Sequence, residues 1–178
     1  KQCRKCDLAE SKLTDADLTN ADLFLANLTV ADLRGANLSG ANLSAANLYK
    51  ANLTGANLTD ANLIGAKLHR ANLSGADLTA ANLKTVNLAR AILTDAILLR
   101  VKFSAADLFW ANLSRANLRW ANLRKANLYG ANLTGANLTG ANLTGANLTG
   151  ANLKVIFLKE PIFCKTTMPD GTINNVGC

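Results

Sequence analysis

The chain is poor in the residues that most enzymes use for chemistry. Its 178 residues include one histidine and two prolines, and only 5% are aromatic. With no G-x-S-x-G motif, no paired catalytic carboxylates and no phosphate-cradling glycine loop, little remains for acid–base or covalent catalysis. Polar residues interrupt almost every stretch, so we expect no insertion into a membrane. The sequence therefore predicts a protein that is not an enzyme and has no catalytic residues, no metal site and no cofactor.

What the sequence has instead is a five-residue repeat. Between Leu8 and Leu158 every fifth residue is leucine at 30 of 31 positions, and Phe103 is the exception. The residue two before each leucine, from Ala16 to Ala151, is alanine at 26 of 28 positions. The residue directly before leucine is asparagine or aspartate at 24 of those 28 positions. Internal periodicity of this kind determines the fold before any other signal does.

A period of five fits neither a straight helix nor a flat strand. Five residues advance a helix by roughly 140°, so the leucines would spiral around it. In a strand, side chains alternate with a period of two, and an odd repeat would send successive leucines to opposite faces. The repeat instead predicts a chain that bends once per unit and turns leucine and alanine inward. The polar residues and glycines at the other positions suit the bends, and stacked coils of such a chain form a solenoid.

The unit A-[ND]-L-x-x resembles the pentapeptide-repeat family, and the resemblance runs from Ser11 to Leu158 without a break in register. It implies an all-β fold, a right-handed quadrilateral β-helix (solenoid) with four repeats per coil, about seven coils and short N- and C-terminal caps. We expect a single domain with an N-terminal cap over residues 1–10, the β-helix over residues 11–158 and a C-terminal cap over residues 159–178.

Both ends of the repeat need a cover, because an exposed strand edge invites aggregation. We expect residues 1–10 to hide the core of the first coil, with room for one helical turn. At the other end Pro161 should end the strand pairing, since proline has no amide hydrogen to donate. Four apolar residues should seal the last coil: Val155, Ile156, Phe157 and Phe163.

Four cysteines lie in pairs at the two ends. Cys164 and Cys178 flank a tail without repeats, and a disulfide that closes this loop is favoured over two unpaired thiols. The tail also resembles the ends of pentapeptide-repeat proteins from cyanobacteria and the chloroplast lumen, for which an oxidising compartment is suitable. Cys3 and Cys6 form a C-x-x-C motif, typical of a redox pair, half a zinc site or a local structural pair. The sequence offers neither a thioredoxin-like context nor nearby zinc ligands, which favours structural or idle cysteines.

The repeat departs from its own rule between Val86 and Phe103. Val86 and Val101 replace inward alanines and Phe103 replaces an inward leucine, so this coil is expected to widen. Ile92 and Ile97 take outward positions that elsewhere hold asparagine or aspartate. Exposed apolar residues at these positions indicate either a contact surface or drift in a tolerant repeat.

Charge and aromatic residues gather in the same part of the chain. Residues 84–125 contain eight basic and two acidic residues, so they carry +6 of the net charge of +7. If four repeats close a coil, residues twenty apart stack in columns and residues ten apart lie on opposite faces. Stacked aromatics with interleaved bases can bind a polyanion or a protein, or simply stabilise a solvated face. The candidate interaction surface comprises Tyr49, Arg90, Ile92, Ile97, Leu99, Arg100, Phe109, Trp110, Arg119, Trp120 and Tyr129.

These features favour a monomeric, non-enzymatic structural or binding scaffold with a protein partner. The end cysteines favour a thylakoid lumen or a periplasm, reached with a targeting peptide that has been removed, and the cytoplasm is the alternative. Some members of the family mimic DNA with strongly acidic surfaces and bind topoisomerases such as gyrase, but a net charge of +7 opposes that role. A polyanion binder with a basic and aromatic face is the remaining alternative, although nucleic acid is disfavoured as its ligand.

Overall fold

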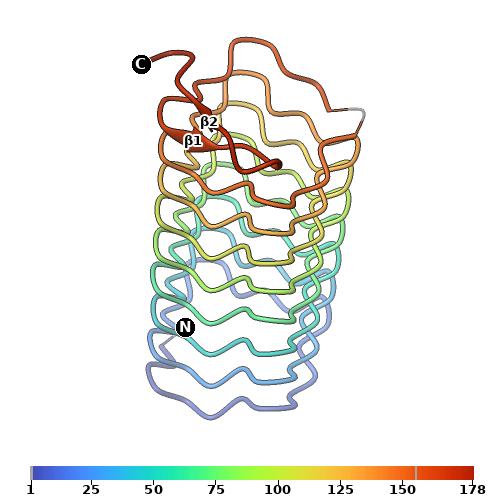
Figure 1. Ribbon diagram of the computed structural model, residues 1–178. Coiled ribbons are helices and arrows are strands. Elements are labelled where there is room, and N and C mark those ends of the chain that lie inside the picture. Colours follow the sequence, from blue (N-terminus) through green and yellow to red (C-terminus); the bar gives the residue numbers. More distant parts are fainter. Residues whose placement is uncertain (1, 155) are drawn as a thin grey trace.

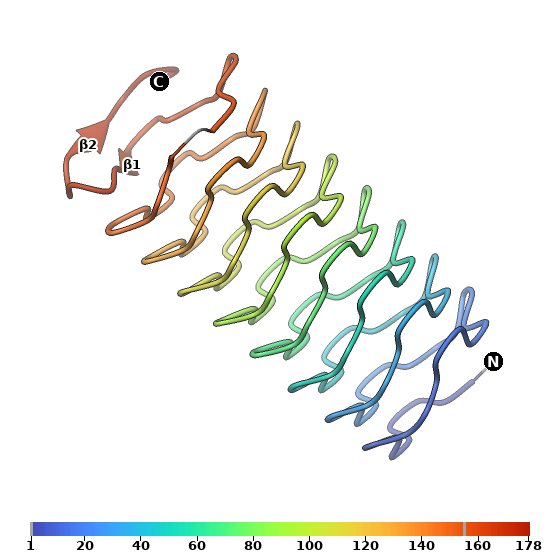
Figure 2. The same cartoon turned by 90° about the vertical axis from the view of Figure 1, so that its right-hand side faces the viewer.

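The computed structural model describes residues 2–154 and 156–178, and these wind into a rod of stacked coils (Figure 1). Parallel β-bridges join the residue directly before each leucine position of the repeat to the residue twenty further along the chain, from Gln2↔Asp22 to Asn147↔Thr167. Each coil therefore has twenty residues on four sides, which confirms four repeats per coil. A view turned by 90° separates the coils into evenly stacked layers between the two ends of the chain (Figure 2).

The core consists of the alanine and the leucine of each repeat. From Ala21 to Leu148 every side chain at these positions is at most 2% exposed, which confirms the inward assignment. The backbone is satisfied between coils: the Leu53 amide donates to the Asn72 carbonyl at 2.7 Å, and the Asn72 amide donates to the Ala51 carbonyl at 3.0 Å. Because each coil supplies the hydrogen-bond partners of the next, the fold extends along one dimension.

Each corner of a coil is held by the asparagine directly before the leucine, which binds the residue two positions after that asparagine. The Asn52 Oδ1 atom accepts hydrogen bonds from the Thr54 amide at 3.2 Å and the Thr54 hydroxyl at 2.6 Å. The next residue has a positive φ, 67° at Gly55 but also 59° at Val30. Glycine adopts this conformation without strain, whereas a β-branched residue does so at a cost.

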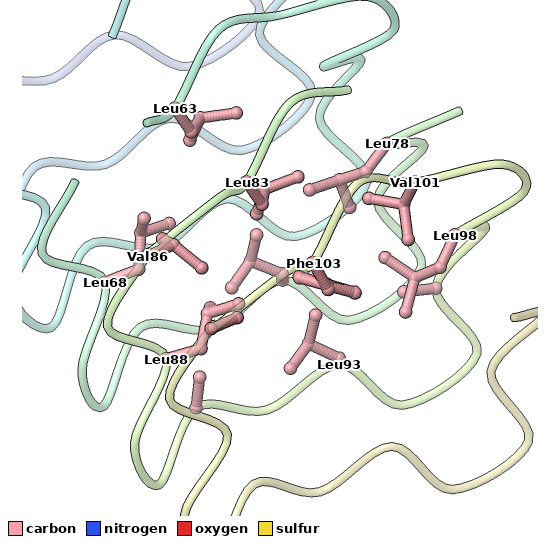
Figure 3. Packing of buried hydrophobic residues seen from close by; sticks show 14 of the residues in the cluster. Leu63, Leu68, Leu78, Leu83, Val86, Leu88, Leu93, Leu98, Val101 and Phe103 are labelled. Carbon is pink, nitrogen blue, oxygen red and sulfur yellow. The ribbon is translucent and has the colours of Figure 1, made fainter. Parts of the chain in front are cut away.

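Phe103 fits the core without disturbing the stacking of the coils. Its ring lies in the interior among leucines and valines (Figure 3), and it is fully buried. The Phe103 amide keeps its inter-coil hydrogen bond to the Asn122 carbonyl at 2.8 Å. The turn bonds made by the Val86 and Val101 amides measure 3.3 Å each, and the one made by the Ala96 amide between them measures 3.2 Å. The bridges on either side keep the twenty-residue register, so the larger inward residues leave the stacking of the coils intact.

Residues 2–10 do not form the separate N-terminal cap that we expected. Gln2 and Asp7 bridge to the next coil in the same register as the repeats, and no helix occurs among the described residues. The reason is spacing, because Cys3 and Cys6 occupy the leucine and alanine positions of the first repeats. The core of the first coil is therefore not hidden, and its leucines are only partly buried: Leu8, Leu13 and Leu18.

A short hairpin covers the other end of the rod. Strand β1 (Thr166–Thr167) pairs with strand β2 (Ile173–Asn174) in antiparallel register, with Thr166 opposite Asn174 (Figure 1). Thr166 is fully buried, and its hydroxyl donates to the Leu143 carbonyl at 2.6 Å. Phe163, only 8% exposed, seals the last coil as expected.

Two expectations at this end are wrong. Pro161 does not end the pairing, since Ile162 still bridges to Asn142. Proline stands at the alanine position, where the amide closes only the turn and the inter-coil donor is the following residue. Phe157 is 60% exposed, because it stands at the outward asparagine position. Ile156 is partly buried against the core as expected, and Val155 lies outside the described residues.

Candidate interaction surface

The eleven candidate residues lie on two opposite corners of the rod and on the two sides between them. One corner, which we call the aromatic corner, holds Tyr49, Lys50, His69, Arg70, Arg90, Phe109, Trp110 and Tyr129. The opposite corner, the Trp120 corner, holds Leu99, Arg100, Arg119 and Trp120. This placement follows from the twenty-residue coil, since residues ten apart are two sides apart. Except for Tyr49, which stands two coils nearer the N-terminus than Arg90, the candidates lie within residues 90–129, but they do not form one flat face.

Side chains at the aromatic corner form two separate stacks. Tyr49 and His69 stack with ring centroids 4.3 Å apart, and Phe109 and Tyr129 stack at 5.6 Å. Ala89 stands between the two stacks in the column and interrupts it. The exposed Trp110 indole meets the Phe109 ring edge-on at 6.4 Å. The aromatic column of this corner therefore consists of two separate pairs.

The Trp120 corner carries one large exposed indole beside bases. Trp120 is 48% exposed, and its ring covers the position where a Cβ would lie on Gly140, one coil further along. The Arg100 amide donates to the Arg119 carbonyl at 2.9 Å, so these two arginines lie on adjacent coils. Leu99, half-buried, precedes Arg100 at the same corner.

Ile92 and Ile97 lie on the two sides between these corners, and they are 41% and 40% exposed. An asparagine at this position caps its corner, as the Asn117 Oδ1 atom does for the Arg119 amide at 3.3 Å. Isoleucine has no side-chain acceptor, so each of these corners loses that hydrogen bond. The two isoleucines thus expose apolar surface at the expense of local turn stability.

The eight bases of residues 84–125 divide into three groups. Arg115 makes two hydrogen bonds to Asp95, at 2.7 and 2.6 Å, which lower the pKa of the Asp95 carboxyl and raise that of Arg115. Arg90 stands at the aromatic corner. The other six surround a single side of the rod, which we call the basic side: Lys84, Arg100, Lys102, Arg119, Arg124 and Lys125.

Sequence reasoning missed the basic side, although its signal was present. Lys102 stands in the middle of this side, where it bridges to Asn82 below and Asn122 above. Arg100 and Arg119 stand at the preceding corner, and the remaining bases stand at the following corner. All six are exposed, and no ion pair within residues 2–154 and 156–178 involves any of them. Grouping the bases by side, rather than by column, would have found this face.

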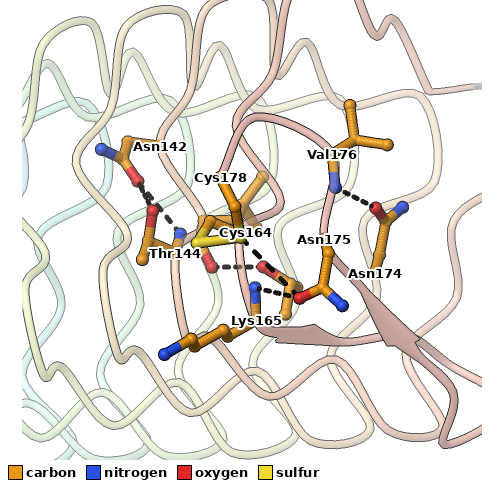
Figure 4. Close-up of a disulfide and its surroundings, with 10 residues drawn as sticks. Asn142, Thr144, Cys164, Lys165, Asn174, Asn175, Val176 and Cys178 are labelled. Atoms are coloured by element: carbon orange, nitrogen blue, oxygen red, sulfur yellow. Dashed lines mark hydrogen bonds between the residues drawn. A yellow bond between two sulfur atoms is a disulfide. The ribbon is translucent and has the colours of Figure 1, made fainter.

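All four cysteines form disulfides. Cys3 pairs with Cys6, and Cys164 pairs with Cys178, with Cα atoms 5.2 and 4.6 Å apart. The second disulfide ties the chain end to the start of the hairpin, where the Lys165 amide also donates to Asn175 Oδ1 at 3.2 Å (Figure 4). The expected closed loop is confirmed, and the Cys3–Cys6 motif is a local pair.

Some kinds of site have no counterpart in residues 2–154 and 156–178. There, no group of three histidine, cysteine, aspartate or glutamate side chains could hold a metal ion, and no pocket opens on the surface. The same residues include no helix long and apolar enough to cross a membrane. What the described surface offers for binding is therefore its corners and sides.

Comparison with known proteins identifies relatives along nearly the whole chain. The family model for pentapeptide repeats matches residues 2–40, 36–75, 71–108, 102–140 and 111–150. The chain is 35% identical to HetL, a protein involved in heterocyst differentiation regulation from the cyanobacterium Nostoc sp. strain PCC 7120, over 97% of this chain and 91% of HetL, with a TM-score of 0.43. No functionally curated sequence matches the chain.

Two further structures extend this comparison. A pentapeptide repeat protein from the Arabidopsis thaliana thylakoid lumen is 30% identical over 63% of this chain and 71% of its own, with a TM-score of 0.29. QnrB1, a plasmid-mediated fluoroquinolone resistance protein, is 19% identical over 85% of this chain and 86% of its own, with a TM-score of 0.65. At that identity the likeness to QnrB1 concerns the fold alone.

Proposed function

We propose, because the chain belongs to the pentapeptide-repeat family, that it is a non-enzymatic scaffold that binds a protein partner through residues 86–125. We call these residues the irregular band. The family fold is a right-handed quadrilateral β-helix, and the similarity to solved family structures supports it for this chain. Such a rod presents side chains at fixed spacing without needing to change shape, which suits a binding role.

One observation carries this proposal: the irregular band exposes four large apolar side chains, two at the asparagine position of the repeat and two at its glycine position. Ile92, Ile97, Trp110 and Trp120 are 40–57% exposed. These apolar residues do not help the fold. At the asparagine position an asparagine would accept the hydrogen bond of the corner, and at the glycine position a glycine would adopt the positive φ without strain. Tryptophan and arginine are the residues enriched at the energetic centres of protein interfaces, and the band holds both. A local departure from the folding rule indicates selection for something other than folding.

A thylakoid lumen or a periplasm is the compartment that we propose. Two disulfides need oxidising surroundings, and a relative 30% identical comes from a thylakoid lumen. Titration of thiols in the native protein, purified without reductant, tests this location. We expect thiols to become reactive only after reduction, and free thiols at Cys164 and Cys178 before reduction would contradict it.

A DNA-mimic role is less well supported. It needs a strongly acidic surface, whereas this chain has a net charge of +7 and a side that carries six bases.

Capture of partners from an extract of the native compartment tests the binding proposal. The tagged protein is compared with Trp110→Ala, with Arg100→Ala/Trp120→Ala, and with Thr134→Ala/Thr144→Ala from the uniform part of the rod as a control. We expect at least one protein to be retained by the wild type and the control but reduced about tenfold in one of the band variants, a loss of ~1.4 kcal/mol. Equal recovery of the same proteins by all four baits would refute binding through the band.

A further inference from the structure

We propose that the basic side is the docking site for an acidic segment of a partner protein, and that Trp120 receives one apolar side chain of that segment. This inference rests on the proposed function and specifies the partner's chemistry. Its basis is the convergence of six unpaired bases and one exposed indole on a single side of the rod.

The six charges are close enough to act together. They occupy three successive coils, which at the usual strand spacing span about 10 Å along the rod. That length is close to the Debye length of about 8 Å at physiological ionic strength, so the potentials of the six groups add. A flat side with one sign of charge attracts an oppositely charged ligand and steers it during encounter.

The acidic residues of the same stretch do not neutralise this side. Asp95 is held by Arg115 on another corner. Asp107 lies on another side, where its Oδ1 atom accepts from the Asn127 side chain at 3.0 Å and from the Phe109 amide at 3.1 Å. In the column of Arg100 the nearest acid toward the N-terminus is Asp60, two coils or about 10 Å away.

Folding does not require these bases. The coil formed by residues 131–150 has the same inter-coil ladder and the same buried core without a single charged residue. Six like charges on one side repel one another, and no ion pair in the described chain offsets this repulsion. A cluster that the fold does not need, and that costs stability, is explained by a ligand of opposite charge.

Trp120 favours a protein partner over a nucleic acid. One face of its indole rests on Gly140, which holds the ring in place. The Trp120 side chain therefore loses little conformational entropy when a ligand binds its free face. A single fixed aromatic suits one apolar anchor of a peptide. Single-stranded nucleic acid instead needs a series of aromatic platforms for successive bases, and this side has one.

A synthetic peptide of glutamate and aspartate with one central phenylalanine is the probe, used at 150 mM NaCl with the full chain. Its affinity is measured by fluorescence anisotropy for the wild type and two triple variants of equal charge. One is Arg100→Gln/Lys102→Gln/Arg124→Gln on the basic side. The other is Lys50→Gln/Lys67→Gln/Arg70→Gln, at and beside the aromatic corner and outside the irregular band. We expect about a tenfold weaker affinity for the first and less than about a twofold change for the second.

Tryptophan emission reports where the phenylalanine binds. Trp110→Phe leaves Trp120 as the only indole, and the peptide should shift its emission. Trp120→Phe leaves Trp110, on the opposite corner, and its emission should not change. A peptide without phenylalanine should bind more weakly and leave both spectra unchanged.

Several outcomes would overturn the inference: equal weakening by both triple variants, no response from Trp120, or tighter binding of a DNA duplex of matched charge that the peptide cannot displace. Failure of this inference is distinguishable from failure of the proposed function. A native partner that Trp110→Ala loses and the basic-side variant keeps would refute the docking site and leave the scaffold role intact.

Discussion

The indole of Trp120 lies across Gly140, one coil further along the rod. A Cβ atom on Gly140 would come within 2.7 Å of Trp120 Cδ2, which is closer than side-chain atoms approach. Trp110 and Gly130 repeat this relationship on the opposite corner, where a Cβ atom on Gly130 would come within 2.7 Å of Trp110 Cε2. Each exposed tryptophan is therefore supported by a glycine that leaves room for its ring.

Replacing Gly140 by alanine should displace Trp120. Both Gly140 and Gly75 have positive φ, at 68° and 65°, so alanine costs roughly 1 kcal/mol at either position. Nothing lies within 4 Å of a Cβ at Gly75. In the Trp110→Phe background, Gly140→Ala should change the emission of Trp120 and Gly75→Ala should not. An unchanged spectrum in both would show that the glycine does not hold the ring.

The core assignment predicts a sharp contrast between neighbours. Leu138 is 2% exposed, so Leu138→Ala should lower the free energy of unfolding by ~2–5 kcal/mol. The Thr139 side chain faces outward at the corner, where its amide bonds to Asn137, and Thr139→Ala should change stability by less than about 0.5 kcal/mol. Chemical denaturation of the two variants measures both values, and similar losses would contradict the inward position of leucine.

The exposed isoleucines should be removable with a gain in stability. Ile92→Asn and Ile97→Asn each supply the acceptor that the corner lacks, worth ~0.5–1.5 kcal/mol. The reverse change Asn112→Ile, which removes the bond to the Ser114 amide at 3.1 Å, should destabilise by a similar amount. Thermal unfolding compares the three. If both isoleucine variants were less stable than the wild type, the apolar positions would serve the fold and not a partner.

Acid should remove a small part of the stability through Asp32. Two hydrogen bonds from the Arg34 side chain, at 2.8 and 2.6 Å, lower the pKa of Asp32 to about 2 from the ordinary 3.8. A carboxyl with a lowered folded-state pKa stabilises above its unfolded pKa, so this contribution is lost as the pH falls from 3.8 to about 2. Unfolding at successive pH values should give a flatter profile for Asp32→Asn and for Arg34→Gln. The effect is small because the pair is exposed.

The disulfide at the end of the rod should control the hairpin. Cys164 and Cys178 are fourteen residues apart, and closure of such a loop contributes ~3 kcal/mol. Cys164→Ser/Cys178→Ser should loosen β1 and β2 and speed amide exchange there, while the coils near the N-terminus stay protected. Cys3→Ser/Cys6→Ser, which opens a much shorter loop, is the matched control. If either variant lost protection from amide exchange equally at both ends of the rod, each disulfide would not act only on its own end, which would contradict the prediction.

The sequence predicted the repeating part of this fold because one rule acts at every leucine and alanine. The sequence-based prediction failed at the C-terminal end of the rod. There, residues that were expected to stop or seal the repeat stand at positions where they do neither. Pro161 replaces an alanine whose amide only closes a turn, and Phe157 follows the outward register. The basic side escaped prediction for another reason. Its members are spread over 42 residues of sequence, from Lys84 to Lys125, and only the length of a coil shows that they lie around one side.

The central claim is that binding resides in the irregular band and folding in the repeat. It is tested most directly by replacing residues 86–125 with eight copies of the A-N-L-T-G unit of residues 131–150, which keeps the register. We predict that this variant unfolds at the same or a higher temperature and no longer captures the native partner. Undiminished capture by a folded variant without the band would contradict the account.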